Sequence, residues 1–277
     1  MNTPFVTTEW LATRLGDPKT VIVDASWYLP AANRDAQEEY LAGHIPGAVF
    51  FDIDAIADTS TGLPHMLLAP EPFAMAAGAL GIGDDMTIVI YDGAGLFSAA
   101  RAWWEFTAMG ATDVRILEGG APQWIADGRP LESGPVSRPT RTFTPRFRPE
   151  LVRGHADVKA AIAARQQIAD ARPAGRFSGR DPEPRPGLPS GHMPGAVSLP
   201  AADLVAGGRL KPTAELKAMF EAAGLDLDRH VVTSCGSGVT AATLMLALSL
   251  AGAKQVAVYD GSWAEWASRP DSEIVTG

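Results

Sequence analysis

The sequence predicts an α/β protein of two tandem domains, each a parallel sheet with helices on both faces. Three observations carry this prediction: the length of 277 residues, a series of motifs that occurs twice, and strand-like runs that alternate with helical ones. At about 150 residues per domain, this length corresponds to roughly 1.8 domains. With 46% hydrophobic and 20% charged residues, the chain can form packed cores, which excludes a wholly disordered protein.

The clearest sign of two domains is an internal repeat. The hexapeptide His-Ile-Pro-Gly-Ala-Val at 44–49 returns as His-Met-Pro-Gly-Ala-Val at 192–197. Other landmarks keep the same order in both copies: Asp24 and Asp170, Asp92 and Cys235, Gly119 and Gly261, Trp124 and Trp266. A shared order of this kind indicates a tandem duplication. We expect an N-terminal domain at 1–138, a proline-rich linker at 139–150 and a C-terminal domain at 151–277.

In the first copy, buried strands are expected at 21–24, 48–51, 88–91 and 114–117, and in the second copy one is expected at 231–233. Helices are expected at 96–109 and 240–251, each followed by a glycine. Strands separated by helices pair in parallel, and their ligands gather beyond the carboxyl ends of the strands. Cys235 falls at such an end.

Charge and cysteine content exclude several classes of protein. The net charge of −9 disfavours nucleic-acid binding, which needs a basic surface. The single cysteine rules out an internal disulfide. Residues 1–16 lack a signal-peptide pattern, and the uncharged run at 231–253 is too polar in its first half to suggest a membrane span. We expect a cytoplasmic protein that binds neither nucleic acid nor membrane.

The cysteine loop, Cys235-Gly236-Ser237-Gly238-Val239-Thr240, joins a strand to a helix. Its glycines permit a tight path in which successive N–H groups point inward, and the helix adds the positive end of its dipole. Both effects favour the thiolate over the thiol, so Cys235 is predicted to be a nucleophile. A Cys-x5-Arg phosphatase loop is disfavoured because position 241 is alanine.

The duplicated unit, its His-x-Pro-Gly-Ala motif and a cysteine loop in the second copy alone resemble the two-domain rhodanese superfamily. The loop is similar in particular to that of its 3-mercaptopyruvate sulfurtransferase branch. The thiosulfate-using branch has arginine and lysine where this chain has Gly236 and Ser237. Because Asp92 stands at the cysteine position of the first copy, the resemblance implies that the first domain is catalytically silent.

A proline-rich stretch at 181–194 occurs only in the second copy, which suggests a functional insertion. The resemblance assigns substrate binding to Arg176, before this stretch, and to Arg185, within it. A fork of N–H donors suits a small keto-carboxylate. The loop residues Gly236, Gly238, Val239 and Thr240 complete the expected substrate site. The resemblance also implies a proton relay of Ser237, Asp54 and His65, whereas the paired His44 and His192 are expected to be structural.

The resemblance implies transfer of sulfur from 3-mercaptopyruvate, through a Cys235 persulfide, to a thiol acceptor such as thioredoxin or to cyanide, with release of pyruvate. No cofactor is expected, because the cysteine itself carries the sulfur, and no metal site is indicated by the residue spacing. Two alternatives remain at this stage: thiosulfate as the main sulfur donor, and a non-catalytic module whose cysteine senses oxidants.

Overall fold

The computed structural model describes residues 3–277 and divides into two compact units. Segments 3–57, 67–148 and 207–209 form the N-terminal unit, while 58–66, 149–206 and 210–277 form the C-terminal unit. Of the predicted linker at 139–150, residues 139–148 group with the N-terminal unit and residues 149–150 with the C-terminal unit. Segment 58–66, although it comes from the first half of the sequence, packs with the C-terminal unit.

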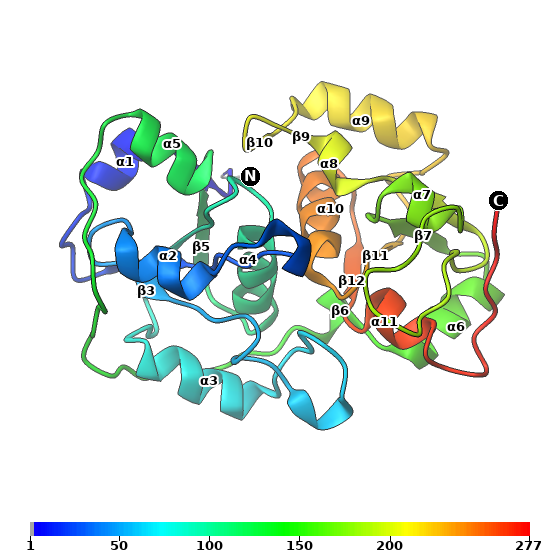
Figure 1. The fold of residues 1–277 in the computed structure, drawn as a ribbon, viewed down its shortest axis with the longest axis horizontal. Helices are drawn as coiled ribbons and strands as arrows, with labels where there is room; N and C mark the ends of the chain where they lie inside the picture. Colours follow the sequence, from blue (N-terminus) through cyan, green and yellow to red (C-terminus); the bar gives the residue numbers. More distant parts are fainter. Residues whose placement is uncertain (1–2) are drawn as a thin grey trace. The chain divides into compact units, whose positions relative to one another are not determined.

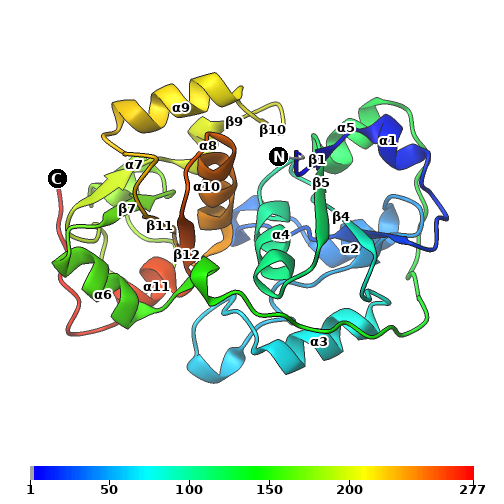
Figure 2. The same cartoon turned by 180° about the vertical axis from the view of Figure 1, so that it is seen from behind.

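Each unit contains a five-stranded parallel sheet with helices on both faces, as predicted (Figures 1 and 2). The strands of the N-terminal sheet, in spatial order, are β1 (Phe5–Val6), β5 (Asp113–Leu117), β4 (Thr87–Tyr91), β2 (Thr20–Asp24) and β3 (Val49–Phe50). Those of the C-terminal sheet are β6 (Val152–Arg153), β12 (Val256–Tyr259), β11 (Val231–Ser234), β7 (Gln167–Asp170) and β8 (Ala196–Ser198). The identical order in both sheets extends the repeat from sequence to topology.

The two helices predicted at the glycine-ended segments are present, with shifted ends. The first, α4, spans Ala99–Ala108, and the second, α10, spans Val239–Leu250. The other helices are α1 (Thr8–Ala12), α2 (Ala36–Ala42), α3 (Pro70–Ala79), α5 (Gly120–Ala126), α6 (His155–Ala163), α7 (Ala174–Phe177), α8 (Ala201–Leu204), α9 (Thr213–Ala222) and α11 (Ser262–Trp266). The short strands β9 (Val205–Ala206) and β10 (Arg209–Leu210) pair with each other in a separate two-stranded sheet.

Equivalent residues of the two copies form the cores. In the N-terminal unit Ile22, Ile45 and Trp124 belong to one buried cluster. Their counterparts Ile168, Met193 and Trp266 belong to the corresponding cluster of the C-terminal unit. The apolar positions of the repeat are therefore explained by packing against one face of each sheet, where each buried large side chain contributes about 1.5–3 kcal/mol.

The strand register places the chemistry at one edge of the C-terminal sheet. In the pairing of β7 with β11, Asp170 lies opposite Ser234, the residue before Cys235. Both strands end there, and the chain after β11 turns directly into α10. Cys235 therefore lies at the carboxyl end of the central strand, as the sequence predicted.

Candidate active site

The backbone around Cys235 is held by the start of α11. The Cys235 and Gly236 carbonyls accept hydrogen bonds from the N–H groups of Trp263 (3.0 Å) and Ala264 (2.9 Å). The Cys235 N–H donates to Oγ of Ser262 at 3.1 Å. These contacts fix the path of the loop, and Cys235 is buried, with 2% of the residue exposed. Sequence reasoning did not identify Ser262.

The rest of the loop leads into the N-terminus of α10. Gly238 caps the helix with φ of 82°, in the left-handed region that favours glycine. Val239 is the first helical residue and is buried, whereas Thr240 remains partly exposed. The twelve residues of α10 place the positive end of a helix dipole at the cysteine, which stabilises an anion there.

The matching loop of the first copy shows which kind of group such a backbone holds. Asp92 is fully buried, and one of its carboxylate oxygens accepts the N–H groups of Phe97, Ser98 and Ala99 at 2.7–2.8 Å. Its other oxygen accepts the N–H of Ala94 at 2.9 Å. The N-terminal cradle is thus filled by an anion that belongs to the chain itself. In the second copy the corresponding residue is Cys235.

Arg176 and Arg185 come together at the cysteine loop. A Cβ atom added to Gly236 would lie 3.0 Å from Nη2 of Arg176 and 3.6 Å from Nη1 of Arg185. Both guanidinium groups therefore approach the same backbone position, next to Cys235. The side chain of Arg176 is 15% exposed, so it is partly accessible to a ligand.

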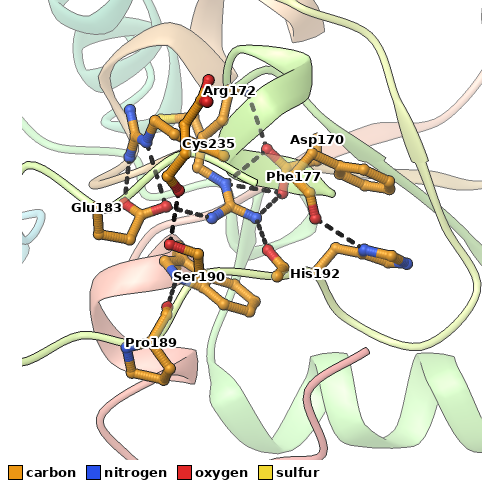
Figure 3. Close-up of polar contacts among 12 residues, drawn as sticks. Asp170, Arg172, Phe177, Glu183, Pro189, Ser190, His192 and Cys235 are labelled. Atoms are coloured by element: carbon orange, nitrogen blue, oxygen red, sulfur yellow. Dashed lines mark hydrogen bonds and ion pairs between the residues drawn. The ribbon is translucent and has the colours of Figure 1, made fainter. Parts of the chain in front are cut away.

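Three further charged residues near this site were missed by sequence reasoning: Asp170, Arg172 and Glu183. The Arg172 guanidinium donates to both Asp170 oxygens at 2.7–3.0 Å and to Oε1 of Glu183 at 2.8 Å (Figure 3). Burial alone would lower the pKa of Arg172, but the two carboxylates outweigh burial and raise it. One sequence signal was present, because Arg172 follows the Asp-Ala pair where the first copy has Ser26.

Two residues of the predicted proton relay, His65 and Ser237, are in contact. Nδ1 of His65 lies 2.9 Å from Oγ of Ser237, and both residues are buried within the C-terminal unit. His65 itself adopts φ of 59°, in the left-handed region that is uncommon for residues other than glycine. Asp54 belongs to the N-terminal unit, where its carboxylate accepts the indole N–H of Trp27 at 2.9 Å. The catalytic role of all three stays a prediction.

The paired histidines have equivalent structural surroundings. The ring of His44 stacks on Tyr40 at 4.2 Å and that of His192 on Phe177 at 3.9 Å. In both, Nδ1 lies within 2.9 Å of the carbonyl oxygen of the stacked residue. Each histidine also forms an isolated β-bridge, to Glu132 and Val275 respectively. These contacts support the structural role predicted for the pair.

Across residues 3–277, no helix is long and apolar enough to cross a membrane. The same residues contain no group of three or more His, Cys, Asp or Glu side chains arranged to hold a metal ion.

Comparisons with known proteins agree with this architecture. The family model of the rhodanese-like domain matches twice, at residues 7–127 and 155–269. The 3-mercaptopyruvate sulfurtransferase of Escherichia coli (strain K12) is 47% identical over 98% of this chain and 97% of its own length. Thiosulfate/3-mercaptopyruvate sulfurtransferase 2 of Arabidopsis thaliana is 43% identical over 99% of this chain and 87% of its own.

A solved structure also resembles this protein along most of the chain. The crystal structure of SseA from Escherichia coli, described as showing the rhodanese fold and catalytic mechanism of 3-mercaptopyruvate sulfotransferases, superimposes with a TM-score of 0.87. It is 45% identical and covers 95% of this chain and 99% of that one. With the duplicated sheets and the single cysteine loop, these matches show that the chain belongs to the rhodanese family.

Proposed function

We propose that this protein is a 3-mercaptopyruvate sulfurtransferase. It moves the sulfur of 3-mercaptopyruvate through a persulfide on Cys235 to a thiol acceptor or cyanide, and it releases pyruvate. The names of the relatives from Escherichia coli and Arabidopsis thaliana support this activity. The observation that carries the proposal is the approach of Arg176 and Arg185 to Gly236, because two guanidinium groups beside a cysteine suit a small carboxylate that contains sulfur.

In the first half-reaction, Arg176 and Arg185 bind the carboxylate and keto oxygens of the substrate. The Cys235 thiolate attacks the substrate sulfur, an S–S bond forms, and the carbon–sulfur bond breaks. The electron pair of that bond passes to the departing carbon fragment, the enolate of pyruvate. This enolate takes up one proton, which in this proposal is relayed by Ser237; its contact with His65 at 2.9 Å supports that role.

In the second half-reaction, an acceptor takes the outer sulfur and restores the Cys235 thiolate. A dithiol protein such as thioredoxin is a chemically suitable acceptor, because its second thiol can resolve the resulting persulfide. The loop that carries Cys235 holds the persulfide anion at the N-terminus of α10 between the two half-reactions. A reaction that needs a reduced cysteine and a thiol acceptor fits a reducing compartment such as the cytoplasm.

Thiosulfate is a second candidate donor, since the Arabidopsis thaliana relative is named for both donors. A comparison of kcat/KM for mercaptopyruvate and thiosulfate decides between them. We expect mercaptopyruvate to be preferred, because its planar carboxylate matches the two-pronged donors of arginine.

The decisive test is mass spectrometry of the protein after addition of mercaptopyruvate without an acceptor. We expect the mass of one added sulfur atom on the peptide that contains Cys235, together with release of pyruvate. Cys235→Ser should show neither, because a serine hydroxyl is scarcely ionised near neutral pH and forms no persulfide. Pyruvate release by Cys235→Ser would refute the proposal, since the chain has no second cysteine.

A further inference from the structure

A buried carboxylate, Glu183, joins two arginines beside the cysteine loop. Its side chain is only 2% exposed, although it comes from the proline-rich insertion of the second copy. Oε1 accepts a hydrogen bond from Nη1 of Arg172 at 2.8 Å, and the same carboxylate pairs with Arg176. A carboxylate so enclosed is held by its partners rather than by water.

The contact with Arg176 is two-pronged. Nε donates to one Glu183 oxygen at 3.1 Å and Nη2 donates to the other at 2.5 Å. This geometry fixes the plane of the guanidinium, because both bonds constrain one rigid group. Glu183 occupies the Nε edge of the Arg176 guanidinium, and the Nη edge is left to face other partners. Nη2 is also the atom that lies 3.0 Å from a Cβ built on Gly236.

Glu183 is itself held in place by Arg172. That side chain is 1% exposed, donates to Asp170 and to the carbonyl of Gly191 at 2.7 Å, and lies 4.1 Å from the ring centre of Trp263. The Trp263 N–H donates to the Cys235 carbonyl. A continuous path of contacts thus runs from the cysteine through Trp263 and Arg172 to Glu183, and returns through Arg176 to the loop.

The charges of this network balance. Asp170 and Glu183 carry two negative charges, and Arg172 and Arg176 carry two positive charges. Arg176 therefore offers directed N–H donors whose charge is already matched by a buried partner. Such a donor distinguishes ligands by shape more than by total charge, and a dianion gains less from it than from an unmatched cation.

We propose that Glu183, braced by Arg172, is a positioning residue that fixes the guanidinium of Arg176 at the cysteine loop and so selects keto-carboxylate donors over donors of higher charge. This inference rests on the proposed function, because it concerns the substrate of the same site. It adds to that function a residue that sets donor selectivity without itself touching the substrate.

The test is a double-mutant cycle with Glu183→Gln, Arg176→Ala and the combined variant. We expect Glu183→Gln to raise KM for mercaptopyruvate about tenfold while kcat changes less than about twofold, the pattern of lost substrate binding. In the Arg176→Ala background the same substitution should add less than about a twofold change, because its effect passes through the arginine. The preference for mercaptopyruvate over thiosulfate, as a ratio of kcat/KM, should fall about tenfold in Glu183→Gln.

Glu215→Gln is the matched control, because that glutamate pairs with Lys211 on the surface and is half exposed; its kinetics should equal those of the unmodified protein. Thermal denaturation checks that each variant folds. If Glu183→Gln does not fold, Glu183→Asp replaces it, since the shorter side chain keeps the charge but cannot span both prongs of Arg176 and the contact with Arg172.

The outcomes are distinguishable. Lack of mercaptopyruvate turnover by the unmodified protein would refute the proposed function and this inference with it. Normal turnover combined with an unchanged KM in a folded Glu183 variant would refute this inference alone. Equal effects of the Glu183 substitution with and without Arg176 would likewise refute it, because they would show a general structural role.

Discussion

Gly236 is the residue at which the cysteine loop meets both arginines that we propose to bind the substrate, Arg176 and Arg185. Its φ lies outside the left-handed region, so alanine fits the backbone, but the added Cβ would lie 3.0 Å from Nη2 of Arg176. Glu183 restrains that guanidinium and limits its retreat. We expect Gly236→Ala to raise KM for mercaptopyruvate about tenfold, equivalent to roughly 1.4 kcal/mol.

Steady-state kinetics measure this effect, and Gly154→Ala serves as a control. An added Cβ at Gly154 would meet nothing closer than 3.8 Å, so its KM should not change. An unchanged KM in Gly236→Ala would show that the arginines move freely and that their approach to the loop does not determine substrate binding.

Ser262 combines backbone strain with a hydrogen bond to the cysteine. It is fully buried with φ of 48°, whereas the equivalent residue of the first copy is Gly120 with φ of 57°. Its Oγ accepts the Cys235 N–H and donates to the Tyr259 carbonyl. Strain of about 1–3 kcal/mol at such a residue is typical of functional sites.

We therefore expect Ser262→Gly to lower kcat/KM about tenfold while the free energy of unfolding changes by less than about 1 kcal/mol, because relief of strain offsets the lost hydrogen bonds. Ser262→Ala retains the strain and should be the less stable of the two variants. Chemical denaturation and turnover measure both quantities. Full activity in Ser262→Gly would mean that glycine positions the loop equally well.

The N-terminus of helix α4 is stabilised by hydrogen bonds to the carboxylate of Asp92. Four backbone N–H groups of its loop and first turn donate to this side chain. Asp92→Ala would leave these buried donors without their acceptor, and we expect a loss of about 2–4 kcal/mol in the free energy of unfolding. Asp92→Asn, which keeps one carbonyl oxygen, should lose less.

Turnover per folded molecule should remain within about twofold in Asp92→Ala, because the first copy has no cysteine. Urea unfolding gives the stability, and pyruvate release under native conditions gives the turnover. A large loss of turnover in a folded Asp92→Ala protein would contradict the prediction that the first domain is catalytically silent.

The same helix shows which features the sequence could predict. Apolar patterning placed β2, β4, β5 and α10 within one or two residues, because burial in a sheet or against it imposes that pattern. The predicted start of α4 at residue 96 was three residues early, since the N–H groups of Phe97 and Ser98 bind Asp92 before the helix begins at Ala99. A side-chain contact of that kind has no periodic signature.

In the candidate site too, the sequence predicted some of the residues and not others. Cys235 was located by its position between a strand and a helix, and Arg176 and Arg185 by resemblance to the rhodanese superfamily. Glu183 and Arg172 have no sequence signal of burial, because they are buried through contacts that Arg172 makes with the insertion, at Glu183 and at the Gly191 carbonyl. The packing of segment 58–66 with the C-terminal unit likewise depends on tertiary contacts.

The two copies of the repeat each contain a buried aspartate at the end of an equivalent strand, Asp24 in β2 and Asp170 in β7, but the two side chains have different partners. In the second copy Asp170 pairs with Arg172. In the first copy, Ser26 occupies the position of Arg172, two residues after Asp24. Ser26 donates to the Asp24 carboxylate through its N–H and its hydroxyl. Burial raises the pKa of Asp24 above 3.8, despite the two hydrogen bonds from Ser26, and the charge of Asp92 adds to the increase.

A raised pKa in the folded state means that the folded protein holds this proton more tightly than the unfolded chain does. Below about pH 3.8 both states are protonated and Asp24 costs no stability through ionisation. Above that pH, ionisation favours the unfolded chain until the folded carboxyl also ionises. Asp24→Asn, which keeps an oxygen to accept from Ser26, should therefore raise Tm at neutral pH, and the gain should shrink as the pH falls toward about 3.8.

Asp170→Asn is the matched comparison and should act in the opposite direction. It removes one of the two carboxylates that neutralise the buried Arg172. Tm should therefore fall at neutral pH, because a buried cation with fewer charge partners destabilises the folded protein. Thermal denaturation of both variants and the unmodified protein between about pH 4 and pH 8 measures the two trends. If Asp24→Asn lowered Tm at neutral pH, its ionised carboxylate would be a net stabilising group, and burial would not be the dominant influence on that site.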